Sequence, residues 1–180
     1  GFCFFNNIAI AARYMQRRHG IARVLIVDWD VHHGNGTQHT FYDDASVLFF
    51  STHQYPHYPG TGRESERGGG SAEGQTINVP MSGGEGDERY RDVFTEVLVP
   101  AADRFKPDVV LISAGFDAHR DDPLASMDLT EDGYAELTRI VAGIARRHAG
   151  GRVIAFLEGG YNLNALAVSV ERHLVALLAA

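Results

Sequence analysis

The sequence predicts a three-layer α/β/α sandwich built around a mainly parallel sheet. The first observation is a set of short, nearly continuous apolar runs rich in β-branched and aromatic residues: Val24–Val27, Val47–Phe50, Val109–Ile112 and Val153–Leu157. Runs of this kind are typical of parallel strands that are buried on both faces. The second observation is that helical patterns alternate with these runs, which is the order of elements in α/β folds.

Four stretches have helical spacing of their apolar residues: Asn6–Arg18, Asp87–Phe105, Thr130 to about His148, and Asn164–Leu178. We expect Gly20 to end the first, because glycine readily adopts the left-handed conformation that closes a helix. Pro100 should kink or divide the second. Thr130 is a suitable N-cap for the third, with acidic residues in the first turn after it.

The segment between Gln54 and Gly74 is rich in Gly, Pro, His, Tyr and Ser. A long loop without regular structure in a compact domain is usually either functional or disordered. We therefore expect no helix or strand here, and either a functional or a disordered loop.

Composition limits the class of protein. A chain of 180 residues with 44% hydrophobic and 22% charged residues is typical of one soluble globular domain. The net charge of −7 argues against a broad nucleic-acid-binding surface. We find no apolar run of membrane-spanning length and no secretion leader, and the single Cys3 excludes a disulfide framework and a Cys-rich zinc site. We expect a cytoplasmic protein.

Polar residues follow each predicted strand, and sites in parallel sheets form beyond the carboxyl ends of the strands. In an extended segment Asp28, Asp30 and His32 would point to one side. Two carboxylates and an imidazole that face one another favour a bound cation, and Asp117 after the third run supplies another ligand. Taken one at a time, these residues are better explained by a helix cap at Asp28 or Asp30 and a buried, hydrogen-bonded histidine at His32. The cluster predicts a metal site of Asp30, His32 and Asp117, with a coordination position left open for catalysis.

Tyr161 follows the pair Gly159-Gly160. Glycines allow close backbone approach, and a phenol there is suited to donate to the oxyanion that amide hydrolysis produces. A tyrosine in an ordinary turn is the alternative. We interpret His53, His57 and His119 as structural or solvent-facing, because no partner pattern accompanies them.

Four motifs together resemble the histone deacetylase superfamily, in its order and over essentially the whole chain. They are Gly1–Asn7 (GFCFFNN), Asp30–Thr37 (DVHHGNGT), Ala114–Ala118 (AGFDA) and Leu157–Leu163 (LEGGYNL). Asn35, Phe116 and Glu158 are most similar to the class II and bacterial deacetylase branch. That branch also includes the acetylpolyamine amidohydrolases.

The resemblance implies an arginase-like fold with Zn²⁺, or Fe²⁺, on Asp30, His32 and Asp117. It implies that Tyr161 polarises the acetyl carbonyl and that Asn35 and Asp28 orient two catalytic histidines. The implied substrate-binding residues are Gly1, Phe2, Tyr58, Leu124, Gly159 and Gly160. A structural K⁺ or Na⁺ would use Asp28, Ser51, and carbonyls around Asp30, His32 and Thr52, and a second would use carbonyls near Phe41, Asp44, Val47 and Gln75.

The chain departs from the family at its start. The tandem histidines that act as general base and acid come shortly before the Gly-Phe-Cys segment, and this chain begins at that Gly1. His32-His33 is not that pair, because His32 is assigned to the metal. We therefore expect residues 1–180 to be one partial catalytic domain, truncated before Gly1 and lacking sheet strands from the missing part. Loss of general acid–base catalysis typically costs about 10²–10⁴-fold in rate.

The implied reaction is deacetylation of acetyl-lysine in proteins or peptides, which Leu124 at the tunnel rim favours. Acetylpolyamines or other small acetylated amines are the alternative substrates, and an inactive zinc-binding fragment is the alternative to an enzyme. We expect no direct nucleic-acid or membrane partner. A strand that runs into Asp28-x-Asp30 also fits haloacid dehalogenase-type phosphotransferases, but the only lysine, Lys106, precedes the third strand at the wrong end of the sheet.

Overall fold

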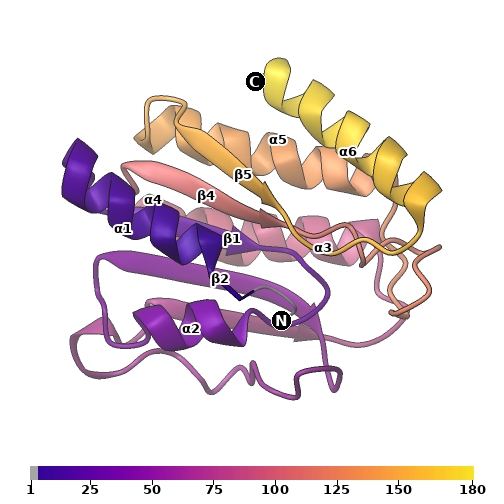
Figure 1. Cartoon of the computed structure of the whole chain (residues 1–180), viewed down its shortest axis with the longest axis horizontal. Helices are drawn as coiled ribbons and strands as arrows, with labels where there is room; N and C mark the ends of the chain where they lie inside the picture. Colours follow the sequence, from indigo (N-terminus) through magenta and orange to yellow (C-terminus); the bar gives the residue numbers. More distant parts are fainter. Residues whose placement is uncertain (1–3) are drawn as a thin grey trace.

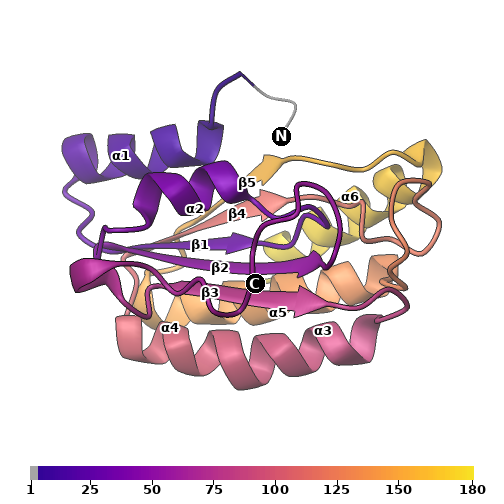
Figure 2. The same ribbon diagram turned by 90° about the horizontal axis from the view of Figure 1, so that it is seen from below.

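The computed structural model describes residues 4–180, which form five parallel strands in the order β3-β2-β1-β4-β5. The strands are β1 (Val24–Asp28), β2 (Val47–Gln54), β3 (Thr76–Met81), β4 (Val109–Ala114) and β5 (Val153–Leu157). Figure 2 shows α1 (Asn7–His19) and α2 (Asn35–Phe41) on one face of the sheet, and α3 (Asp87–Val93), α4 (Val99–Phe105) and α5 (Glu131–His148) on the other. The final helix, α6 (Leu163–Leu178), lies beside α5 (Figure 1). The predicted three-layer α/β/α class is confirmed.

Two apolar cores flank the sheet, and the central strands contribute to both. From β1, Leu25 and Val27 join the core under α3 and α5, while Val24 and Ile26 join the core under α1. This division follows from the alternation of side chains along a strand. It explains why the central strands read as continuous apolar runs.

The strand β5 does not fit the prediction that every apolar run is buried on both faces. It forms one edge of the described sheet, and Ile154 and Leu157 are 38% and 64% exposed. An apolar run specifies that a segment is a strand, but it does not specify whether other elements cover that strand.

The helix ends follow the predicted capping signals. The Thr130 side chain accepts a hydrogen bond from the backbone N–H of Gly133, and Gly20 closes α1 in the left-handed conformation with φ 66°. Around Pro100 the predicted division is confirmed: a π-helical segment, Phe94–Leu98, separates α3 from α4. Since proline has no N–H and its ring crowds the carbonyl of the residue four positions before it, regular α-helical bonding cannot continue through this stretch.

The sequence patterns missed two elements, β3 and α2. The strand β3 alternates apolar with polar residues and contains Pro80, which is tolerated because β3 is an edge strand paired only with β2 among the described residues. The helix α2 is short and mostly polar, so it gives little periodic signal.

The loop after β2 is ordered by buried histidines. His53 donates from Nε2 to the carbonyl of Gly62 at 2.8 Å, and His33 Nδ1 lies 2.7 Å from Thr61 Oγ1. A short 3₁₀ turn, Gly70–Ala72, completes the loop. The expectation of a segment without regular structure therefore holds, apart from this turn. None of the described helices is long and apolar enough to cross a membrane.

A pH dependence of stability follows from His173 on α6. This side chain is 3% exposed, and burial lowers its pKa to about 4. The unfolded ring has a pKa of about 6.5, so the unfolded state binds more protons between these values and stability is lost as the pH falls from about 6.5 toward 4. Between pH 6.5 and 5 the wild type should lose about 2 kcal/mol more than His173→Leu. Urea unfolding of both proteins tests this, and parallel pH curves would contradict it. Buried carboxyl groups affect both proteins equally.

Candidate metal centre and surrounding pocket

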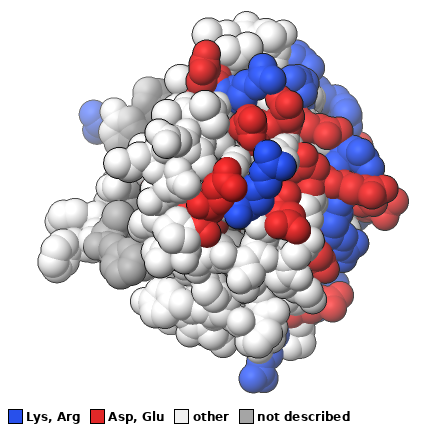
Figure 3. Space-filling model, turned by 90° about the vertical axis from the view of Figure 1, so that its right-hand side faces the viewer, with Lys and Arg blue, Asp and Glu red and all other residues white. Residues whose placement is uncertain are grey.

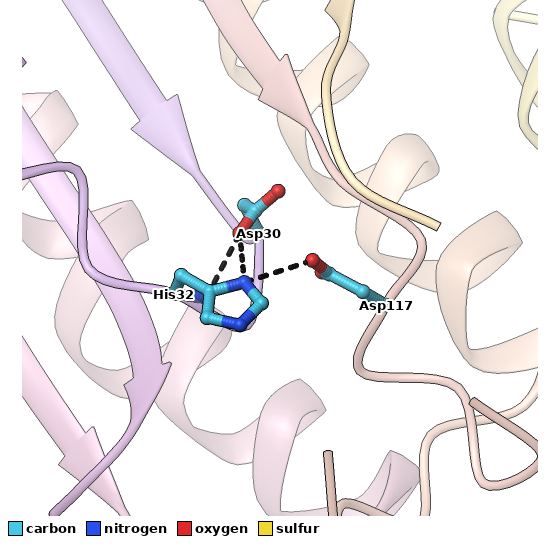
Figure 4. Close-up of side chains that lie close together, drawn as sticks. All are labelled: Asp30, His32 and Asp117. Atoms are coloured by element: carbon cyan, nitrogen blue, oxygen red, sulfur yellow. Dashed lines mark hydrogen bonds and ion pairs between the residues drawn. The ribbon is translucent and has the colours of Figure 1, made fainter. Parts of the chain in front are cut away.

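Three side chains converge beyond the carboxyl ends of two central strands, as Figure 4 shows. Asp30 and His32 follow β1, and Asp117 follows β4. His32 Nδ1 lies 3.2 Å from Asp30 Oδ1 and 3.1 Å from Asp117 Oδ2. One donor atom from each residue lies within 4.8 Å of the others. The structure thus brings together the three residues that the sequence predicts as metal ligands.

The chain reaches this arrangement by a bend and not by an extended segment. The strand β1 ends at Asp28, so the expectation of strand geometry through His32 is wrong. The backbone N–H of Asp30 donates to Asp28 Oδ1 at 3.2 Å, and that of His32 donates to Asp30 Oδ1 at 2.8 Å. Aspartate side chains favour such local bonds over continued strand pairing. Asp28, Asp30 and His32 nevertheless line one pocket.

The electrostatics of the cluster favour a cation between the carboxylates. Hydrogen bonds with Asp117 and Asp30 raise the pKa of His32 to about 10. Burial raises the pKa of Asp117 to about 6, and burial together with Asp30 raises the pKa of Asp28. Carboxyl groups that are buried close together oppose one another's ionisation unless positive charge compensates them. A divalent metal ion supplies that charge, and carboxylate and imidazole donors suit zinc and iron.

Two glycines make room for the acidic side chains. A Cβ built on Gly115 would lie 2.5 Å from the Asp30 Cα, and one on Gly159 would lie 2.7 Å from Asp30 Oδ2 and from Asp117 Cγ. The Gly159 N–H also donates to Asp30 Oδ2 at 2.9 Å. Any larger residue at either position would displace a carboxylate. The carboxylate and imidazole donors, and the space that Gly115 and Gly159 leave for them, therefore fit a small metal ion.

Replacing Gly159 with alanine should weaken metal binding by at least about 10-fold, the scale seen for residues that orient ligands. The new methyl group would push aside the carboxylates of Asp30 and Asp117. Competition with a chromophoric chelator measures the dissociation constant. The matched control is Gly143→Ala in α5, where the nearest heavy atom to a new Cβ is 4.0 Å away. Equal metal affinity in the two variants would contradict the assignment.

The pocket around the three ligands is also lined by five of the predicted catalytic and substrate-binding residues: Asp28, Asn35, Tyr58, Gly159 and Tyr161. The Tyr161 ring centroid lies 6.4 Å from that of His32, and the Tyr58 ring lies 6.1 Å away. Gly160 has φ 145°, and a Cβ there would press on Leu166. It thus shapes the turn before Tyr161 but, among the described residues, does not line the pocket. Gly1 and Phe2 lie outside the described residues.

Leu124 is 48% exposed, and the residues that line the pocket within positions 4–180 do not include it. It is linked to Tyr161 through Asp122, a residue that the sequence reasoning missed. Asp122 Oδ1 accepts from the N–H of Leu124 at 2.9 Å, and Oδ2 accepts from the N–H of Tyr161 at 2.7 Å. Asp122 is 6% exposed, so it fixes the Tyr161 backbone from a buried position. An Asp before Pro123 is an ordinary turn signal, which gave no hint of this role.

The predicted monovalent-cation residues lie in two places. Strand register sets Asp28 beside Ser51, with Thr52 next along β2, close to the metal cluster. The carbonyls of Phe41, Asp44 and Gln75 accept backbone bonds at the start of β2, two of them from Val47 and Phe49. The structure thus groups each set as the resemblance implies, and their cation-binding role stays a prediction.

The three histidines interpreted as structural differ in their contacts. His53 and His119 are buried and hydrogen-bonded, His119 to Glu131 at 3.3 Å. His57 instead stacks on the metal-ligand candidate His32, with ring centroids 5.1 Å apart and an interplanar angle of 25°. Of the two interpretations of His57, the structural one fits this contact, because folding of the loop after β2 places its half-buried ring against His32.

Figure 3 shows the face toward which the strand arrows of Figure 1 point. Acidic and basic side chains alternate over one part of this face, and the other part is largely uncharged. Nucleic-acid binding requires a continuous basic area. The described residues form no such area on this face.

The chain is similar to known proteins over nearly its whole length. The family model described as "Histone deacetylase domain" matches residues 1–177. "Histone deacetylase 14, chloroplastic" from Arabidopsis thaliana is 52% identical over 99% of this chain and 42% of its own length. A "Probable deacetylase" from Archaeoglobus fulgidus is 49% identical over 91% of this chain and 45% of its own. The chain therefore spans less than half the length of these relatives.

A solved structure is also similar to this chain. The structure titled "Crystal Structure of HDA15 HD domain" has a TM-score of 0.94 and 46% identity, over 99% of this chain and 50% of that chain. The predicted arginase- and deacetylase-like α/β fold is confirmed. On the family match, the identity to named deacetylases and this shared fold, the chain belongs to the histone deacetylase family and is part of its catalytic domain.

Proposed function

We propose that the protein carrying this chain is a zinc-dependent deacetylase that hydrolyses the acetyl amide of acetyl-lysine in proteins or peptides. The observation that carries the proposal is the convergence of Asp30, His32 and Asp117 in a pocket that Tyr161 also lines. Residues 1–180 would form one partial catalytic domain. Fe²⁺ is the alternative metal, since carboxylate and imidazole ligands suit both ions. A cytoplasmic location stays a prediction.

The residues of this chain would hold the metal and shape the transition state. A metal at this site supplies Lewis-acid chemistry, polarising the amide carbonyl and lowering the pKa of a water. Asp30, His32 and Asp117 would hold it. The Tyr161 hydroxyl would donate to the oxyanion that develops as the carbonyl is attacked. Asp28 and Asn35 would orient two histidines of the whole protein, and these histidines would move the protons.

Substrate selection would depend on the mouth of the pocket. Tyr58 is 58% exposed and lines the pocket, so it would form a wall of the acyl-lysine tunnel. Leu124, tied through Asp122 to the turn that carries Tyr161, would lie at the rim. An apolar rim favours a peptide flank over a polycationic amine, which an acidic residue would attract. K⁺ or Na⁺ at the two predicted monovalent-cation sites, one around Asp28 and Ser51 and one around Phe41 and Gln75, would be structural.

An activity panel on the intact protein tests the proposal. Acetyl-lysine peptides and acetylpolyamines are compared with the metal-chelated protein and after Zn²⁺ or Fe²⁺ is added back. We expect peptide deacetylation that is lost with the metal and restored by it. Turnover of acetylpolyamines alone would support the alternative substrate class. Metal binding without turnover of any acetyl amide would support a zinc-binding protein that is not an enzyme, and activity insensitive to chelation would overturn the metal assignment.

A further inference from the structure

A buried imidazole on α6 contacts the side chains that directly precede both acidic metal-ligand candidates. The His173 ring centroid lies 5.7 Å from that of Trp29 at an interplanar angle of 79°, and 5.8 Å from that of Phe116 at 66°. Trp29 precedes Asp30, and Phe116 precedes Asp117. One ring thus makes edge-to-face contacts with both segments that the metal would join.

His173 is itself fixed to the neighbouring helix α5. Its Nδ1 lies 2.8 Å from Thr138 Oγ1, and this hydroxyl donates to the carbonyl of Tyr134 at 2.7 Å. Because the hydroxyl proton is already used, His173 Nδ1 must be the donor of the first bond. The Tyr134 ring also contacts Phe116, with centroids 4.9 Å apart. The helix pair α5 and α6 therefore determines the position and tilt of the His173 ring.

The chemistry of this position is unlike that of an ordinary core residue. His173 is 3% exposed, lies in an apolar layer, and its Nε2 has no hydrogen-bond partner among the described residues. An unpaired buried nitrogen is destabilising, so an apolar side chain of similar size would serve stability better. The imidazole differs from such a side chain in combining a flat ring with a donor that fixes its orientation.

We propose that His173 is a positioning residue for the metal centre, and this rests on the proposed function. Asp30 and Asp117 follow different strands, and their carboxylates repel each other. The His173 ring, held by Thr138, limits how far the Trp29 and Phe116 segments move apart. The two carboxylates then stay close enough to share one ion. His173 does not touch the metal or the substrate.

The test compares metal dissociation constants for the intact protein and two variants, measured by chelator competition with Zn²⁺ under conditions in which circular dichroism shows each protein folded. His173→Leu keeps an apolar side chain and loses the ring, and it should weaken Zn²⁺ binding about 10-fold, within the range known for residues that orient ligands. His173→Phe keeps a flat ring but loses the bond to Thr138, so it should recover only part of that loss. Urea unfolding should show His173→Leu to be at least as stable as wild type at neutral pH.

A matched control is Val141→Ala in α5, which removes buried apolar atoms from the same core but takes no part in the ring contacts of His173. It should lower stability while leaving the Zn²⁺ dissociation constant of the folded protein unchanged. The inference is overturned if His173→Leu binds Zn²⁺ within about twofold of wild type, if His173→Phe loses as much affinity as His173→Leu, or if the control loses equally. A wild type that binds no Zn²⁺ contradicts the proposed function instead.

Discussion

Asp117→Asn should abolish metal loading of the intact protein, with Zn²⁺ affinity reduced by more than about 100-fold, beyond the range for residues outside the coordination shell. Asp117 is 0% exposed, and its Oδ2 lies 3.1 Å from His32 Nδ1. Asparagine keeps the shape and can still accept through Oδ1 from the N–H of Val31, as Asp117 does at 2.8 Å. What it removes is a negative charge and one ligand oxygen.

Metal analysis of the purified protein after dialysis measures the effect directly. The control is Asp103→Asn, which alters a half-exposed carboxylate in α4 that bonds Arg147 and His148 in the last turn of α5. We expect full metal content in the control and almost none in Asp117→Asn. A fully loaded Asp117→Asn protein would remove Asp117 from the ligand set.

Tyr161→Phe should lower kcat by about 10²–10³-fold, which is the cost of losing one donor to an oxyanion. The ring of Tyr161 lies beside His32, and the backbone of this residue is fixed by Asp122, so a phenylalanine ring would occupy the same place. Because the change removes a donor needed mainly in the transition state, KM for an acetyl-lysine peptide should change far less than kcat.

Tyr58→Phe is the matched control, since it removes another phenol hydroxyl from the same pocket. It should leave kcat within a few-fold of wild type, because Tyr58 is assigned to the tunnel wall. Metal content should be normal in both variants. Full turnover by Tyr161→Phe, or an equal loss in Tyr58→Phe, would show that the oxyanion donor has been assigned wrongly.

The sequence was most informative where the physical signal is local. Continuous apolar runs identified β1, β2, β4 and β5, and the side chain of Thr130 marked the start of α5 within one residue. The four motifs identified the family, which the relatives confirm. The ligand cluster was also predictable, because the carboxyl ends of adjacent parallel strands meet at one edge whatever the details of the loops.

The sequence by itself thus determined the fold class, the family and the set of residues gathered at the carboxyl edge of the sheet. Tertiary structure alone decided the exposure of β5, the bonds from Asp122 to the turn of Tyr161, and the contacts of His173 with Trp29 and Phe116. The physical reason is the separation along the chain over which each kind of interaction acts. Propensity, capping and strand patterning act between neighbours in the chain, whereas these contacts join residues that only the packing of helices on the sheet brings together.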